Sequence, residues 1–240
     1  MLTIKNMDEI CDKFVEKKVY RNKNELAPQH PFRMLVVGPS GGGKTNIVMN
    51  LIMEYLDFDK LYLFAKDLQE EKYLTLIALC QSTAKSAGIE ENEVIEYYDD
   101  PTKVDISSFD PQKQNLVVFD DMVTESKKNQ ELIDNLFVRG RKTPNCSVMY
   151  LTQSFFNTPP LLKKQVNYII LLNVNNQREL QEISKTYATD IDYKEFKQMY
   201  KDCIAEQWGF MVLDMKTTNK CMKYRCKFDG LYNPNEDCQE

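Results

Sequence analysis

The feature that most constrains this chain is a glycine-rich segment at residues 38–45. It reads Gly-Pro-Ser-Gly-Gly-Gly-Lys-Thr and matches the pattern G-x-x-x-x-G-K-[ST] at every fixed position. Glycines let successive backbone N–H groups turn toward one anion without a Cβ in the way. An apolar run at residues 34–37 precedes the segment and a helical pattern follows, so a helix N-terminus faces the same point. The segment therefore predicts a phosphate-binding loop between a buried strand and a helix.

The same segment predicts which nucleotide and which metal are bound. Lys44 is expected to contact the β- and γ-phosphates, and Thr45 to give a hydroxyl oxygen to Mg²⁺. No Asn-Lys-x-Asp stretch, the usual guanine-reading element, follows the apolar run at 168–172, so ATP is the expected nucleotide. The predicted nucleotide-binding set is Gly38, Pro39, Ser40, Gly41, Gly42, Gly43, Lys44 and Thr45.

A second motif consists of an apolar run, residues 116–119, that ends in Asp120 and Asp121. Parallel strands end at one edge of their sheet, which places these carboxylates beside the phosphate loop. We expect Asp120 to hold Mg²⁺ through water, and Asp121 to orient or deprotonate the attacking water. The plainer interpretation is a surface turn with two solvated acids.

Three further residues are candidates for catalysis. Gln153 follows the apolar run at 148–151, where an amide can touch the γ-phosphate or the lytic water; an ordinary loop residue is the alternative. Arg139 and Arg141 follow a predicted helix and could reach the γ-phosphate of a neighbouring subunit as an arginine finger. Arg141 is preferred, although cations also suit a solvated helix end. Arg178 and Arg225 are weaker candidates for the same role.

The spacing of apolar residues predicts an α/β fold. Short apolar runs without polar alternation predict buried parallel strands, and helical patterns between them predict helices on both faces of the sheet. After residue 188 the pattern changes to a helix and a closing hairpin. The expected strands are 34–37, 61–64, 116–119, 148–151 and 168–172. The expected helices are 46–56, 68–85, 130–138 and 193–203, with further helix between the last two strands and after the last. The hairpin pairs 209–214 with 221–226.

The expected domain organisation has three parts. Residues 1–30 form an N-terminal helix, at 3–18, and a linker. Residues 31–229 form the ATPase domain, with a core at 32–190 and the C-terminal helix and hairpin at 191–229. Residues 230–240 are expected to be a disordered tail.

Composition limits the kinds of metal site, partner and cellular compartment that suit this chain. Seven cysteines without a CxxC pair, and one histidine, argue against a zinc site and favour unpaired thiols in a reducing compartment. Cys221, Cys226 and His30 are therefore expected to serve packing or to lie on the surface. A net charge of −5 weakly disfavours extensive nucleic-acid contact. No apolar run reaches the roughly 20 residues of a membrane span, so we expect an intracellular, soluble protein.

Beyond these motifs, the stretches VVFDD, RGRKTPNCSVMYLTQS and NYIILLN resemble the FtsK–HerA superfamily of DNA-pumping ATPases. Within it, the chain looks most like the genome-packaging ATPases of poxvirus-like large DNA viruses, virophages and related elements, over residues 32–190. The resemblance implies a RecA-like (ASCE) P-loop NTPase with strand order 5-1-4-3-2. It also implies a homo-oligomeric ring with ATP between subunits and double-stranded DNA in its channel.

Roles carried over from the family agree with those above: phosphate loop for Lys44 and Thr45, metal for Asp120, base for Asp121, sensor for Gln153 and finger for Arg141. Cellular members usually have Glu at the base position, so Asp121 is a departure. The pairs Lys127–Lys128 and Lys163–Lys164 could contact DNA, or could be solvated helix lysines.

The expected function is an ATP-hydrolysing motor that packages a viral genome into a preformed capsid. It would work in the host cytoplasm, a viral factory or the virion, with a capsid or capsid-vertex protein as partner. Two alternatives remain at this point. One is a nucleotide switch for assembly without DNA translocation. The other is a small-molecule or nucleotide kinase, although no arginine-rich lid follows residue 140.

Overall fold

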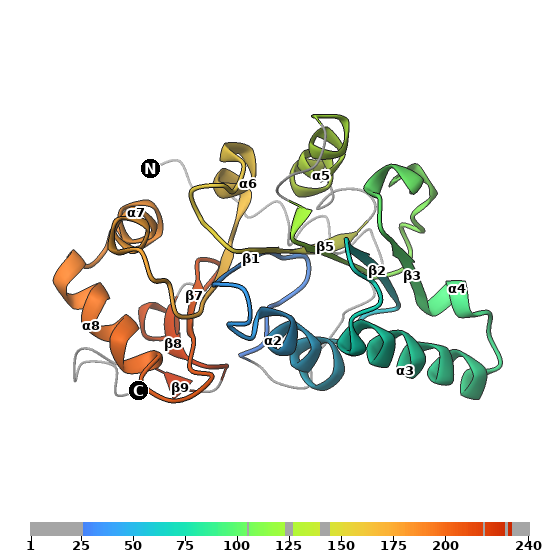
Figure 1. Cartoon of the computed structure of the whole chain (residues 1–240), viewed down its shortest axis with the longest axis horizontal. Coiled ribbons are helices and arrows are strands. Elements are labelled where there is room, and N and C mark those ends of the chain that lie inside the picture. Colours follow the sequence, from blue (N-terminus) through green and yellow to red (C-terminus); the bar gives the residue numbers. More distant parts are fainter. Residues whose placement is uncertain are drawn as a thin grey trace, which may run out of the picture.

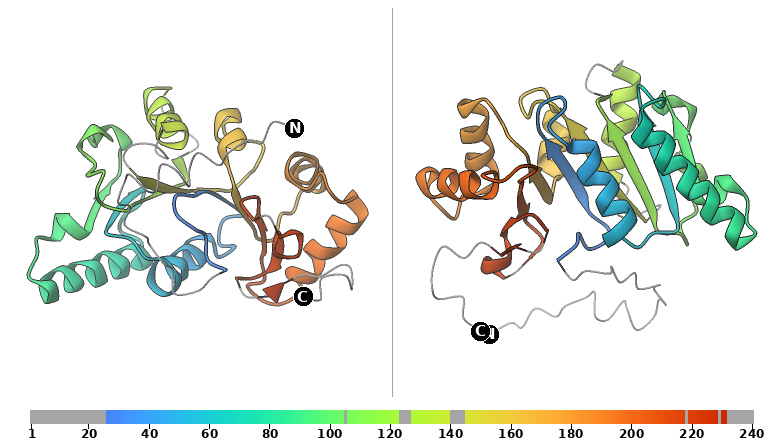
Figure 2. Two further views of the ribbon diagram at one scale, coloured as in Figure 1. Left: turned by 180° about the vertical axis from the view of Figure 1, so that it is seen from behind. Right: turned by 60° about the horizontal axis from the view of Figure 1, so that its bottom comes forward.

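Figure 1 shows a computed structural model in which a central sheet separates two layers of helices. The structure describes residues 26–104, 106–122, 127–139, 145–217, 219–228 and 230–231. Helices α2 (Lys44–Asn50) and α3 (Glu71–Ala87) cover one face, and α5 (Lys127–Arg139) and α6 (Pro160–Gln165) cover the other. The view from behind in Figure 2 shows the same layers. The α/β prediction with both faces covered is confirmed.

The described residues form nine strands in one sheet, ordered β3-β2-β4-β5-β1-β6-β7-β8-β9. From β3 to β6 every neighbouring pair is parallel, and from β6 to β9 every pair is antiparallel. For the five strands predicted in the main sheet this is the expected order 5-1-4-3-2. The bounds are β1 Arg33–Val37, β2 Lys60–Ala65, β3 Ile95–Tyr98, β4 Asn115–Asp120, β5 Cys146–Thr152, β6 Tyr168–Leu171, β7 Met211–Asp214, β8 Tyr224–Cys226 and β9 Gly230–Leu231.

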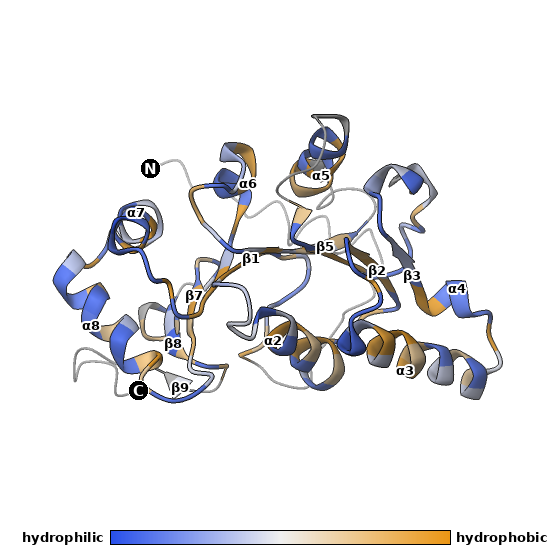
Figure 3. Ribbon diagram, viewed as in Figure 1, coloured by the Kyte–Doolittle hydropathy of each residue, from blue (hydrophilic) through white to orange (hydrophobic). Residues whose placement is uncertain are grey.

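Strands in the middle of the sheet are apolar on both faces because each face has its own core (Figure 3). In β1, Leu35 and Val37 pack into one core, and Met34 and Val36 pack into the other. This arrangement follows from the period-two geometry of a strand. It fixes the register of β1, and therefore the point at which the phosphate loop leaves the sheet.

The remaining helices have recognisable starts and stops. In α7 (Gln177–Tyr187) and α8 (Tyr193–Cys203), the cap side chains Asn176 and Asp192 accept hydrogen bonds from backbone N–H groups of the first turn. Helix α3 ends at Gly88, in the left-handed conformation. A π-helical turn, Leu51–Tyr55, extends α2, and the short elements are α4 (Glu91–Val94) and the 3₁₀ turns Pro101–Lys103, Ile106–Ser108 and Lys220–Met222. Within the described part of the chain, no helix is long and apolar enough to cross a membrane.

Several predicted boundaries differ from the structure. Strand β3 was not predicted, and α3 begins three residues later than expected. Ala27, in the predicted linker, is buried, and the two residues of β9, assigned to the tail, pair with β8. The predicted helix at 3–18 lies outside the described residues.

The prediction that all cysteines are unpaired was wrong. Cys203, at the end of α8, and Cys226, in β8, form a disulfide with Cα atoms 4.7 Å apart. Cys221 is disulfide-bonded as well. The two halves of the first bridge are 23 residues apart in the chain, so spacing alone gave no signal for their pairing.

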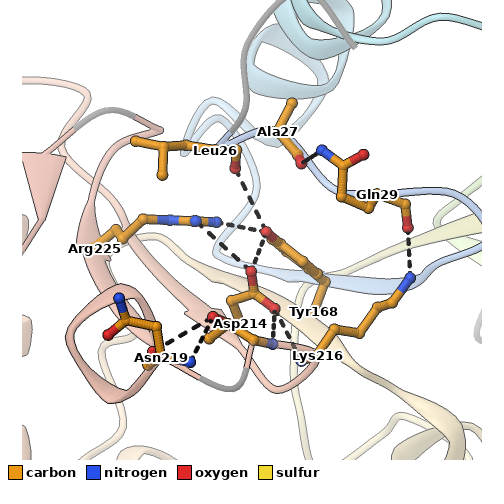
Figure 4. A network of polar contacts seen from close by, with 9 residues as sticks. Leu26, Ala27, Gln29, Tyr168, Asp214, Lys216, Asn219 and Arg225 are labelled. Atoms are coloured by element: carbon orange, nitrogen blue, oxygen red, sulfur yellow. Dashed lines mark hydrogen bonds and ion pairs between the residues drawn. The ribbon is translucent and has the colours of Figure 1, made fainter. Parts of the chain in front are cut away.

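A buried polar network joins the C-terminal hairpin to the main sheet (Figure 4). The Tyr168 hydroxyl donates to Asp214 Oδ2 at 2.5 Å and accepts from Arg225 Nη2 at 2.6 Å. Arg225 Nη1 lies 3.7 Å from the same carboxylate oxygen. Arg225 is 1% exposed, so its suggested role as a finger for another subunit was wrong: its charge is held inside its own chain.

Candidate functional site

A cavity of about 520 Å³ lies at the carboxyl edge of β1, β4 and β5. The structure thus brings the two predicted motifs together, because β4 and β1 both flank β5 in the parallel sheet. The residues that line the cavity are Ser40, Gly41, Gly43, Lys44, Thr45, Asn46, Glu70, Lys72, Asp120, Asp121, Gln153 and Trp208.

The glycine-rich loop is held by its own backbone and by its neighbours. Gly38 N donates to Thr152 O at 3.2 Å, which ties the start of the loop to β5. Gly43 has a φ of 98°, a conformation that residues with a side chain rarely adopt. A Cβ on Gly38 would lie 2.8 Å from Leu172 Cβ. These positions require glycine for backbone shape and for close packing, which is what a phosphate cradle also needs.

Lys44 opens helix α2 beneath this loop and is 8% exposed. Its Nζ donates to the carbonyl oxygens of Gly38 and Pro39, at 3.0 and 3.1 Å. Burial lowers the pKa of Lys44, and the nearby carboxylates of Asp120 and Asp121 oppose that shift. The ammonium group is thus fixed within the cavity at the loop.

Asp120 lies at the end of β4 and accepts hydrogen bonds from two hydroxyls. Thr45 Oγ1 donates to Asp120 Oδ2 at 3.3 Å, and the Tyr73 hydroxyl, from α3, donates to the same oxygen. Burial raises the pKa of the Asp120 carboxyl, although both hydroxyls and Lys44 favour its charged form.

The oxygens of Thr45 and Asp120 fit a magnesium ion. Mg²⁺ in nucleotide sites takes one or two protein oxygens and completes its shell with water and phosphate. A dedicated cluster of three or more ligating side chains is not needed, and none occurs among the described residues.

Asp121 and Gln153 face each other across the ends of β4 and β5. Gln153 Nε2 donates to Asp121 Oδ2 at 3.0 Å, and Asp121 N donates to Leu151 O at 3.3 Å. Asp121 has a φ of 55°, which turns its backbone away from the strand direction directly after Asp120. Both side chains are exposed to solvent, so a water molecule can reach the carboxylate.

None of the candidate finger arginines and DNA-contacting lysines whose side chains the structure describes lines the cavity. Arg178 lies in the exposed first turn of α7, and Lys163 donates to Phe156 O at 3.2 Å and covers the Phe155 ring. Arg139 ends α5, but its side chain, those of Lys127 and Lys128, and the whole of Arg141 lie outside the described residues.

Sequence reasoning missed five residues that line or support the cavity, one of which is Asn46, directly after Thr45 in α2. Tyr73, Glu70 and Lys72 come from the start of α3, which no motif marks. The only sequence signal for these residues was their position: α3 follows β2, which ends at the same edge of the sheet as the strands that flank the cavity. Trp208 also lines the cavity, and its only signal was that the chain has a single tryptophan.

A family model described as "Poxvirus A32 protein" matches residues 16–205, well over half of the chain. No curated protein sequence matches.

The structural comparison finds the genome packaging NTPase B204 from Sulfolobus turreted icosahedral virus 2. Its complex with sulfate has a TM-score of 0.53 at 15% identity, covering 78% of this chain and 93% of that one. Its complex with AMPPCP has a TM-score of 0.52 at 14% identity, covering 79% and 95%. The DNA-packaging ATPase B204 from Sulfolobus turreted icosahedral virus has a TM-score of 0.51 at 16% identity, covering 78% and 95%. At such low identity these similarities establish the fold.

Proposed function

This chain belongs to the poxvirus A32 protein family, and from that premise we propose that it is an ATP-hydrolysing motor that packages double-stranded DNA into a viral capsid. The observation that carries the proposal is the convergence of Lys44, Thr45 and Asp120 in one cavity, with Asp121 and Gln153 at its rim. B204, which shares the fold, was solved with the ATP analogue AMPPCP and is itself a genome packaging NTPase. ATP is accordingly the nucleotide of this site.

The chain's own residues divide the chemistry. The loop N–H groups and Lys44 bind the triphosphate and stabilise the charge that develops on it. Thr45 and Asp120 would hold Mg²⁺, which would neutralise phosphate charge when bound. Asp121 accepts the proton of the attacking water, and Gln153 orients Asp121 and that water through its amide.

Copies of this chain are proposed to form a homo-oligomeric ring around DNA. Asp121 and Gln153 are exposed in the single chain, whereas hydrolysis sites benefit from exclusion of bulk water. A neighbouring subunit would cover this rim and contribute Arg141, or Arg139, to the γ-phosphate. Lysines at 127–128 or 163–164 would line the channel, and a capsid protein would hold the ring.

ATP turnover of the full chain, with and without linear duplex DNA, tests this function. We expect release of free phosphate, stimulation by DNA at low salt, and turnover per chain that rises with protein concentration as rings assemble. Lys44→Ala should lower turnover by about a hundredfold or more, because it removes the positive charge that stabilises the phosphoryl group during transfer.

Lys85→Ala, at the exposed far end of α3, is the matched control and should leave turnover unchanged. A rate of phosphate release that stays the same when DNA of any length is added would favour the nucleotide switch. A phosphorylated acceptor in place of free phosphate would favour the kinase. A folded chain without affinity for ATP or for tripolyphosphate would overturn the site itself.

A further inference from the structure

Trp208 is the single tryptophan of the chain, and it lines the nucleotide cavity while remaining 61% exposed. Its indole lies against the phosphate loop: a Cβ added to Gly43 would sit 3.2 Å from Trp208 Cε3. Exposure of a large apolar ring to water is unfavourable, so a ligand that covers the ring gains binding free energy. The ring is therefore a surface for a ligand in this cavity.

The position of Trp208 in the fold indicates which part of a nucleotide it meets. In the sheet order β4-β5-β1-β6-β7, the phosphate loop follows the central strand β1. Asp120, at the end of β4, lies to one side of β1, and Trp208, which precedes β7, comes from the other side. A triphosphate that crosses the loop with its metal-binding end toward Asp120 directs its opposite end, the nucleoside, toward Trp208.

The turn that carries Trp208 is built to hold it in place. Trp208 has a φ of 63°, which is costly for a bulky residue and persists only when its surroundings enforce it. Gly209 N donates to Glu206 O at 3.0 Å, and a Cβ on Gly209 would lie 2.4 Å from Cys203 O. The disulfide at Cys203 fixes the start of the same turn against β8.

A second contact fixes the middle of the turn. Lys227, which follows β8, pairs with Glu206 at 2.6 Å, and Lys227 N donates to Phe210 O at 2.9 Å. The turn is thus bound to the hairpin on both sides of Trp208. Such pre-ordering lowers the entropy lost when a ligand stacks on the ring.

We propose that Trp208 stacks on the purine base of ATP and so selects a nucleoside triphosphate over a bare polyphosphate. Stacking needs only a flat π-face on the ligand, which a purine base supplies. The inference rests on the proposed function, since it takes ATP as the ligand of this cavity. It adds a base-binding residue to a site whose motif residues contact only phosphate and metal.

Calorimetric titration of the full chain with ATP and with tripolyphosphate, both with Mg²⁺, separates the base from the phosphates. Trp208→Ala should weaken ATP affinity by about tenfold or more, and Trp208→Phe should retain most of it, because base stacking on an aromatic ring has this magnitude. Neither variant should change the affinity for tripolyphosphate. Tyr97→Ala, which removes an exposed ring of edge strand β3, is the matched control and should bind both ligands normally.

Fluorescence of the single tryptophan gives an independent measurement. ATP should change its emission, whereas tripolyphosphate should leave it nearly unaltered. Equal loss of affinity for both ligands in Trp208→Ala would mean that the ring only supports the loop, which would overturn the proposal. Unchanged ATP affinity in that variant would also overturn it and leave the ATPase function intact. Failure of the wild type to bind either ligand would instead contradict the proposed function.

Discussion

At the scale of single residues, the cavity holds a carboxylate and an ammonium group whose charged forms are both disfavoured by burial. Loss of water raises the pKa of Asp120 and lowers that of Lys44, so each ion is costly in the free chain. Each partly offsets the cost of the other. A bound triphosphate with its cation supplies further countercharges, and we therefore expect the ligand to stabilise the folded chain as well as to react there.

His30 allows a test of buried charge away from this cavity. Its Nδ1 and Ser147 Oγ form a hydrogen bond of 2.6 Å, and burial lowers the pKa of His30 to about 4. The imidazole has a pKa of 6.5 in the unfolded chain, so below this pH the unfolded chain binds a proton at His30 and the folded chain does not. Stability from this group is thus present above pH 6.5 and is lost as the pH falls toward 4.

The prediction is a loss of about 2 kcal/mol in the free energy of unfolding between pH 7 and pH 5 from this residue alone. His30→Gln keeps a hydrogen-bonding side chain but does not titrate, so the variant should lose that much less than the wild type over the same range. Urea unfolding at the two pH values measures the difference. Parallel pH profiles for the two proteins would contradict the assignment.

At the scale of elements, sequence periodicity predicted the strands that have two apolar faces, because such runs can be satisfied only inside a covered sheet. It missed β3 (Ile95–Tyr98) at the edge of the sheet, because only Ile95 of this strand is buried and its next residue, Glu96, is charged. Motif spacing predicted the phosphate loop and Asp120 together, since both lie on connections at one edge. It could not predict Tyr73 or Trp208, because contacts between distant segments leave no local pattern.

The hairpin depends on a contact of this non-local kind. Asp214 Oδ1 accepts from the backbone N–H groups of Lys216 and Thr217, at 2.9 and 3.2 Å, while Oδ2 accepts from Tyr168 and pairs with Arg225. One carboxylate therefore balances a buried guanidinium and shapes the turn after β7.

Asp214→Ala should lower the free energy of unfolding by about 3–5 kcal/mol, because it leaves the Arg225 charge buried without its counterion. Tyr168→Phe should cost about 1 kcal/mol, since it removes one hydroxyl from the network. Lys113→Ala, which removes an exposed ion pair with Glu93, is the control and should change little. Denaturant unfolding measures all three. A loss for Asp214→Ala no larger than for Lys113→Ala would contradict the role of the network.

At the scale of the whole molecule, the candidate catalytic rim faces solvent. Helix α5, which ends at Arg139, covers the face of the sheet opposite α2. The last turn of α5 is anchored: the buried Arg33 guanidinium donates to Phe137 O at 2.8 Å and to Cys146 O at 2.7 Å. A fixed helix end is a suitable base for a residue that acts on a neighbour, since its position relative to the sheet is then defined. Both features support the proposed ring.

Mixing inactive subunits tests whether a neighbour completes the site. Lys44→Ala lacks its own phosphate ligand but keeps Arg141, whereas Arg141→Ala keeps the phosphate site but lacks the finger. Where an Arg141→Ala subunit holds ATP beside a Lys44→Ala subunit, one complete site forms, so a random equal mixture should regain up to about a quarter of wild-type turnover. Lys44→Ala mixed with Asp121→Asn is the matched control and should regain none, because both residues belong to the same subunit's cavity. The same experiment with Arg139→Ala decides between the two arginines. If neither arginine variant is rescued by Lys44→Ala, neither Arg139 nor Arg141 acts on the ATP of a neighbouring subunit, and the finger assignment fails.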